Sequence, residues 1–168
     1  MKKIELKDFG NKSDLKVVVE IDKTVFIASI SGNISNIDFP PIEKEPKRKN
    51  ELWTIGCFEI FVSLAGNSYN EYNFGFDECW ECFNFTDYRR DKTRQQFGAP
   101  PKITCSIAES SFTQHVEFNE DIICCNAFSI TAVIKLKNGE FLYFAEKHCG
   151  DKPDFHLAEL RTAILFPN

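Results

Sequence analysis

The sequence predicts an all-β protein, an antiparallel β-sandwich of the jelly-roll-like type with at most short helical turns. Short runs of β-branched and aromatic residues alternate with polar residues at period two, and turn residues separate them. No long window has the helical period, and strands do not alternate with helices. The chain has 168 residues, 43% hydrophobic residues and 17 phenylalanines, enough to fill one core without a metal or disulfide. We therefore expect a single domain over 1–168.

The N-terminal half supplies the first expected strands. The β-branched runs 15–21 and 24–32 are separated by Asp22 and Lys23, which indicates a hairpin with a tight connection. The following segment, 33–50, carries three prolines and many charges and is expected to be a long loop. Three more strands, joined by turns at 65–68 and 77–79, are expected over 55–64, 69–76 and 80–86.

The C-terminal half continues the same pattern. Residues 87–100 are too polar and irregular for a core strand, and the acidic, cysteine-bearing connection 119–127 could form a single helical turn. Asn138 and Gly139 are a strong hairpin signal. The alternating runs that we interpret as strands are 102–109, 114–118, 128–136 and 140–146.

The charge balance argues against a nucleic-acid partner. The formal net charge is −5, whereas nonspecific affinity for nucleic acid comes from clustered lysines and arginines. A local basic run, Lys44 to Lys49, is interleaved with Glu43, Glu45 and Pro46, so we interpret it as a solvated loop.

Targeting signals and cysteine usage favour a cytoplasmic protein. The N-terminal residues lack the apolar segment of a signal peptide, and no apolar run is long enough to span a membrane. Seven cysteines leave at least one unpaired, which fits reduced thiols better than a disulfide framework. Cys79 and Cys82 have the CxxC spacing of zinc and redox sites, but WECFNF indicates a strand, so we interpret them as small buried hydrophobic residues.

A set of aromatic and polar residues could form a sugar site. A pyranose ring packs its C–H faces on an aromatic ring, while its hydroxyl groups need carboxylates, amides and guanidinium groups at the edge. Strand alternation places Glu71 and Asn73 on one face and Tyr72 and Phe74 on the other. The candidate aromatic platforms are Trp53 and Trp80, and the candidate edge groups are Glu59, Glu71, Asn73 and Arg89.

The same residues also have structural interpretations. Both tryptophans can close the ends of the core, and Glu59 with Arg89 can form a partly buried ion pair. Tyr88 can bond a nearby backbone group at a corner, and His156 can cap a turn through its ring.

Several motifs together resemble the DOMON-like proteins related to family-nine carbohydrate-binding modules. They are the runs Cys57 to Val62, Tyr69 to Phe74, Trp80, Phe85 to Arg89 and Lys152 to His156, which cover most of the chain. The resemblance implies a β-sandwich whose ligand is a sugar or, in other DOMON branches, a haem. It also adds His156 to the candidate ligand-binding residues.

The chain departs from this family in two respects. The sugar-binding modules hold their ligand between two tryptophans, but no tryptophan follows Trp80 here, so Tyr143 or Phe144 would have to replace it. The only methionine is Met1, and the spacing of the histidines does not indicate haem ligands, so haem is not expected. No cofactor is predicted. Calcium is an open alternative, although no EF-hand-like loop is present.

The sequence favours a binding module over an enzyme. The motifs GxSxG, HExxH and a phosphate-binding glycine loop are absent, and Glu59 with Glu71 would resemble a glycosidase pair only at a suitable separation. We therefore expect a non-catalytic module for a carbohydrate or similar small polar ligand. The alternative is a structural or protein-interaction sandwich without a small-molecule ligand. The oligomeric state is left open.

Overall fold

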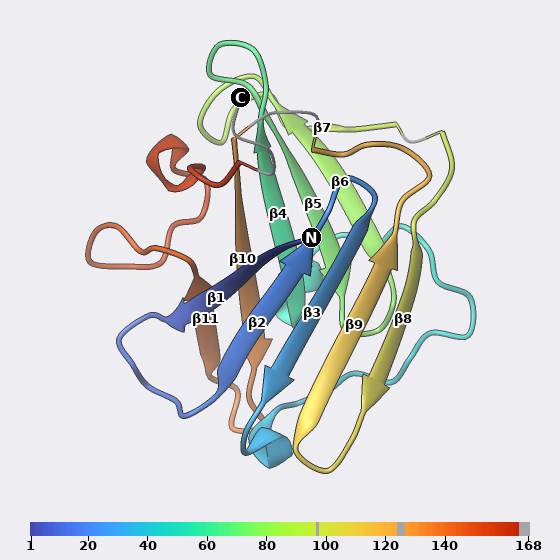
Figure 1. Ribbon diagram of the computed structural model, residues 1–168, viewed down its shortest axis with the longest axis vertical. Helices are drawn as coiled ribbons and strands as arrows, with labels where there is room; N and C mark the ends of the chain where they lie inside the picture. The colour runs from blue at the N-terminus through green and yellow to red at the C-terminus, as the bar shows by residue number, and fades with distance from the viewer. Residues whose placement is uncertain (97, 124–126, 165–168) are drawn as a thin grey trace.

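The structure is a computed structural model that describes residues 1–96, 98–123 and 127–164. These residues form eleven strands and three short 3-10 turns (Figure 1). The strands are β1 (Lys2–Asp8), β2 (Lys16–Ile21), β3 (Val25–Ser31), β4 (Cys57–Ser63), β5 (Tyr69–Gly75), β6 (Trp80–Phe85), β7 (Thr93–Arg94), β8 (Lys102–Ile107), β9 (Ser111–Glu117), β10 (Phe128–Lys135) and β11 (Phe141–Ala145). The turns are η1 (Ile34–Asn36), η2 (Leu52–Thr54) and η3 (Ala158–Leu160).

The strands form one curled antiparallel sheet whose two halves face each other as layers. The hydrogen-bonded order is β7-β6-β5-β4-β10-β11-β1-β2-β3-β9-β8. Strands β1, β2, β3, β9 and β8 form the front layer in Figure 1, and the remaining strands lie behind them. The layers are joined where Lys7 and Asp8 of β1 pair with Ala145 and Phe144 of β11. This architecture confirms the predicted all-β fold.

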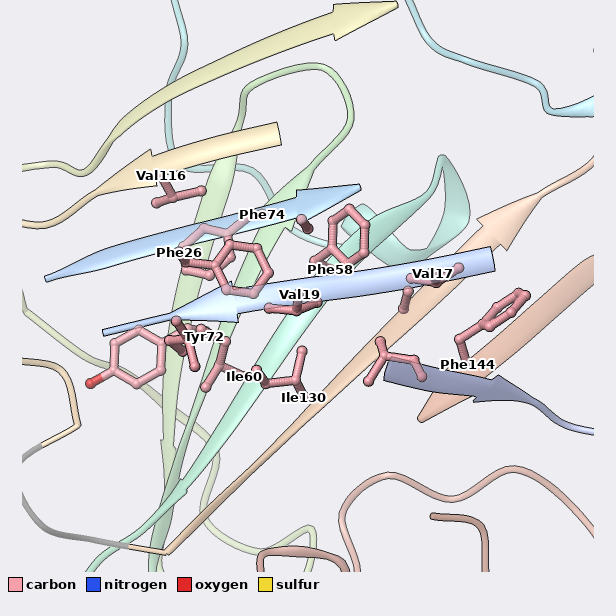
Figure 2. Close-up of a cluster of buried hydrophobic side chains, with 14 of the residues drawn as sticks. Val17, Val19, Phe26, Phe58, Ile60, Tyr72, Phe74, Val116, Ile130 and Phe144 are labelled. Carbon is pink, nitrogen blue, oxygen red and sulfur yellow. The ribbon is translucent and has the colours of Figure 1, made fainter. Parts of the chain in front are cut away.

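The main core lies between the two layers. Phe26 of the front layer packs against Phe58 and Phe74 of the back layer, with ring centroids 5.8 and 5.7 Å away. Figure 2 shows these three residues in the core. Val17 and Val19 of β2 also point inward. Full burial of such a side chain contributes roughly 1.5–3 kcal/mol, so this two-sided apolar layer holds the sandwich together.

A second apolar cluster lies on the outer face of the back layer. Strands β4, β5 and β6 are therefore buried on both faces, unlike β1, β2 and β9, in which buried and exposed residues alternate. The covering residues come from η2 and from the segment after β11. The buried members are Leu52, Cys57, Phe61, Tyr69, Cys79, Phe83, Phe85, Val133, Ala145 and Phe155.

Several local predictions need correction. Strand β1 was not expected, because KKIELKD has only two inward apolar residues, Ile4 and Leu6. Strand β9 begins at Ser111 rather than at 114, and Thr93–Arg94 pairs briefly with β6 inside a segment expected to be irregular. The described part of 119–127 contains no helical turn, and residues 124–126 lie outside the described residues.

Helical structure in the described part of the chain is limited to the three turns of three residues each. No helix there is long and apolar enough to cross a membrane.

Candidate ligand-binding site

The outer face of β4, β5 and β6 is hollowed by two adjoining recesses. The first has a volume of about 610 Å³ and the second about 420 Å³. Both are lined by Trp53, Glu71 and Lys92, so they meet at these residues. The first recess lies over β5 and β6 beside η2 and β7, and the second lies beside the segment that contains Pro153 and His156.

A row of polar residues crosses the strands on this face. Glu81 of β6 is paired in register with Asn73 of β5, and Asn73 with Glu59 of β4. Glu59 is in turn paired with Thr131 of β10. Directly paired residues point to the same face of a sheet, so these four side chains lie in one line. Glu81, Asn73 and Glu59 are each less than 7% exposed, and they form the polar floor of the site.

Glu59 lies at the bottom of the second recess. Its Oε2 atom accepts a hydrogen bond of 3.0 Å from the hydroxyl of Thr131, and the thiol of Cys57 lies 3.7 Å from Oε1. Burial, together with the nearby charge of Glu71, raises the pKa of Glu59 to about 8. At neutral pH this carboxyl is therefore mainly protonated and has a proton to donate.

Glu71 connects the two recesses. Its Oε1 atom accepts a hydrogen bond of 2.9 Å from the amide of Asn73, which lines the first recess. Its Oε2 atom lies 3.8 Å from Nε2 of His156, which lines the second. Burial raises the pKa of Glu71, while the Asn73 hydrogen bond and the charges of Lys92 and Arg89 oppose that shift.

His156 is held in a defined orientation above the floor. Its Nδ1 atom lies 2.7 Å from the hydroxyl of Tyr69, which also accepts the backbone N–H of Arg89 at 3.2 Å. Burial lowers the pKa of His156 to about 4, so the ring is neutral at pH 7. With the Tyr69 hydroxyl as donor to Nδ1, the ring proton is assigned to Nε2, the atom nearest to Glu71.

Asp154 attaches the C-terminal segment to the loop after β6. Its Oδ1 atom accepts hydrogen bonds from Arg89 at 3.0 Å and from the backbone N–H of His156 at 3.2 Å. Its Oδ2 atom accepts the hydroxyl of Tyr88. Burial alone would raise the pKa of Asp154, but the hydrogen bonds from Tyr88 and Arg89 outweigh it and lower that pKa.

The first recess contains a buried carboxylate between two arginines. Glu81 is 1% exposed, and its Oε1 atom accepts Nε of Arg48 at 2.7 Å while Oε2 lies 2.9 Å from the guanidinium of Arg94. Arg48 also lies over the ring of Trp80, 4.9 Å from its centroid. The segment before η2 brings Arg48 here because Lys47 and Lys49 hydrogen-bond to the backbone of Trp80.

Aromatic residues form the rim. Trp53 is 48% exposed, and its ring centroid is 6.3 Å from that of Phe141. Its position depends on Leu52, which packs so closely over Gly75 that an added Cβ there would lie 2.8 Å from the leucine side chain. Tyr143 lies beside Phe155 in the second recess, with a centroid distance of 6.2 Å.

The structure brings most of the sequence-predicted residues to one place. Trp80 is the exception, because it points into the core between the layers and lines neither recess. Tyr143 lines the second recess, whereas Phe144 is buried in the core. The predicted residues that line the recesses are Trp53, Glu59, Glu71, Asn73, Arg89 and His156.

The structure also shows which residues Arg89, Tyr88 and His156 contact. Arg89 pairs with Asp154 rather than with Glu59, and Tyr88 bonds the Asp154 side chain rather than a backbone group. The ring of His156 contacts Tyr69, while the turn there is capped by Asp154.

Other lining residues were not recognised in the sequence. Glu81 lies on the same face of β6 as Phe83. Its cross-strand pairing with Asn73 was the signal that would have identified it as a lining residue. Lys92 and Arg94 follow an irregular loop, so no periodic pattern marks them.

The cysteines and acidic residues near β6 do not form a CxxC metal site in the described structure. Cys79 and Cys82 belong to different apolar clusters, on opposite faces. Ligand atoms of Glu43, Asp77 and Cys79 lie within 4.8 Å of one another. The ammonium group of Lys49 already lies 2.7 Å from Asp77 and 3.7 Å from Glu43, where it supplies the positive charge that these carboxylates need.

Comparisons with known proteins identify a fold relative. No protein-family profile matches the sequence, and the search of curated proteins also found no match. The structure is similar to the crystal structure of a "putative carbohydrate-binding protein" from Bacteroides uniformis ATCC 8492, with a TM-score of 0.65. The alignment covers 96% of this chain and 84% of that one, at 10% sequence identity. At this identity the likeness shows a shared fold.

Proposed function

We propose that this protein is a non-catalytic module that binds a carbohydrate or a similar small polar ligand in the two recesses. The observation that carries the proposal is the combination of buried polar side chains, Glu59, Glu71 and Asn73, with an exposed indole at the rim, Trp53. A sugar needs both, because its C–H faces pack on aromatic rings and its hydroxyl groups need donors and acceptors. The fold relative, described as carbohydrate-binding, supports the same class of ligand.

The protonation states of the floor suit a neutral polyhydroxyl ligand. A protonated Glu59 donates a hydrogen bond, and the Glu71 carboxyl, which already accepts the amide of Asn73, offers oxygen atoms that can accept one. Nε2–H of His156, which lies 3.8 Å from Oε2 of Glu71, provides a second donor in the second recess. A hydroxyl group both donates and accepts, so it can satisfy groups of either kind.

The partner and location proposals rest on composition. The net charge of −5 supports a protein that works without nucleic acid, and the absence of a long apolar run supports one that works without a membrane. Five described cysteines, at 57, 79, 82, 105 and 149, are free thiols, which supports a cytoplasmic location.

Tryptophan fluorescence and calorimetric titration with mono- and oligosaccharides test the proposal. The chain has only two tryptophans, so a change on sugar addition is expected to come from exposed Trp53 and to vanish in Trp53→Phe. Trp80→Phe is the matched control, because Trp80 lies on the other face, and it should keep the response.

Two results would contradict the proposal. Failure of every sugar to bind the folded protein would favour the structural or protein-interaction alternative. Release of shorter products from a bound glycan, abolished in Glu59→Gln, would show that the module is catalytic.

A further inference from the structure

Resting on the proposed function, we propose that the ligand is an oligosaccharide of at least two units that lies across the strands, with one unit in each recess. The two recesses adjoin but are chemically different, and the floor between them is continuous.

The size of each recess supports two subsites. Small-molecule sites occupy roughly 300–1,000 Å³, and recesses of about 610 and 420 Å³ each fall within that range. Each is therefore large enough to accept a ligand unit of its own.

The row of polar residues indicates the direction in which the oligosaccharide lies. The part of this row that lines the recesses runs from Glu81 through Asn73 to Glu59, across β6, β5 and β4. Neighbouring strands lie about 4.8 Å apart, so the two intervals between these three strands span about 10 Å. This length exceeds one pyranose ring, and hydrogen-bonding groups recur along it at every strand.

Glu71 provides continuity at the junction. One of its oxygens is bonded to Asn73 in the first recess, and the other faces His156 in the second. An oligosaccharide that extends from one recess into the other passes over the Glu71 carboxyl, and Trp53 and Lys92 lie beside it. These three residues are shared by both recesses and therefore contact both units.

The two subsites recognise their units differently. The first is dominated by polar groups, with Arg94 held by Glu81 and by Asn50 at 3.3 Å. The second is walled by apolar and aromatic side chains, namely Phe85, Val133, Tyr143 and Phe155. The first is therefore suited to hydroxyl recognition at the ring edge, and the second to packing on a ring face.

Calorimetric titration with cello-, malto- and xylo-oligosaccharides of one to four units tests this inference. For the series that binds, affinity should rise at least about tenfold between one and two units, a step of about 1.4 kcal/mol. Arg94→Met and Asn50→Ala alter only the first recess, and Tyr143→Ala alters only the second.

The first-recess variants should remove most of the gain in affinity that the second unit provides. Tyr143→Ala should weaken sugars of every length. Asn50 is exposed, so Asn50→Ala keeps the test available if Arg94→Met does not fold.

The outcomes separate this inference from the function on which it rests. Equal affinity for one and two units, with no effect of the first-recess variants, would overturn the two-subsite inference while leaving sugar binding intact. Binding of no saccharide at all would overturn both.

Discussion

The carboxyl groups of Glu59 on β4 and Glu71 on β5 both line the second recess, and each is buried with a neutral hydrogen-bond partner rather than a cation. Glu59 accepts from Thr131, and Glu71 accepts from Asn73. Among the described residues, neither carboxyl is within ion-pair distance of a lysine or arginine. Burial, together with the charge of Glu71, raises the pKa of Glu59 to about 8, so the site retains a proton near neutral pH.

Glu59→Gln should abolish a pH dependence of stability. The pKa of Glu59 rises from about 4.5 in the unfolded chain to about 8 in the folded protein, so the folded state binds more protons between these values. Stability is therefore fully present below pH 4.5 and is lost as pH rises through 8. Urea unfolding from pH 5 to 9 should show a loss of roughly 2–5 kcal/mol in the wild type and a flatter profile in Glu59→Gln. Parallel profiles would contradict the buried proton.

The His156 ring should produce the opposite dependence at acid pH. Its pKa falls from 6.5 to about 4 on folding, so the unfolded state binds the extra proton in that window. The stability contribution is present above pH 6.5 and is lost as pH falls through 4. Urea unfolding between pH 4 and 7 should show a shallower loss in His156→Gln than in the wild type. A ring that titrates near 6.5 by NMR would refute the assignment.

Asp154→Asn should loosen the second recess with little cost to the fold. Arg89 is half exposed, so losing its ion pair with Asp154 is expected to change stability by about 1 kcal/mol or less. His156 loses part of its support, so sugar affinity should fall more than stability does. Thermal melting and calorimetry measure the two effects separately, with Asp151→Asn, an exposed neighbour, as the control. A large stability loss with unchanged affinity would contradict this role.

Arg48→Met should destabilise the protein more than Arg94→Met. Both arginines contact buried Glu81, but the side chain of Arg48 is 22% exposed and that of Arg94 is 50% exposed. Removing the more buried arginine leaves the negative charge of Glu81 poorly compensated. This should lower the free energy of unfolding by about 3 kcal/mol or more. Urea unfolding of the two variants at pH 7 provides the comparison, and equal losses would show that the two guanidiniums compensate the carboxylate equally.

Strand alternation accounts for much of the agreement between sequence and structure. Glu71 and Asn73 share a face of β5 while Tyr72 and Phe74 enter the core, as the period of two requires. The hairpin of β2 and β3 follows from its β-branched runs and tight connection. Alternation alone could not identify β1, because its inward face has only two apolar residues.

The sequence left the position of Trp80 open for a different reason. An aromatic residue on a strand is compatible with either face, and the choice depends on which face the second layer covers. Here β6 turns Trp80 toward the inner core and Glu81 outward, where Arg48 and Arg94 reach it from distant segments.

The sequence by itself determined the all-strand fold, the pairing of residues on each strand face and the presence of a polar and aromatic set around β4 and β5, because these depend on local periodicity. Tertiary structure alone decided which strands became neighbours, and hence that Glu81, Asn73, Glu59 and Thr131 form a row. It also decided that the C-terminal segment places His156 over Glu71. Such contacts join residues far apart in the chain, and their geometry depends on strand register and loop closure rather than on local pattern.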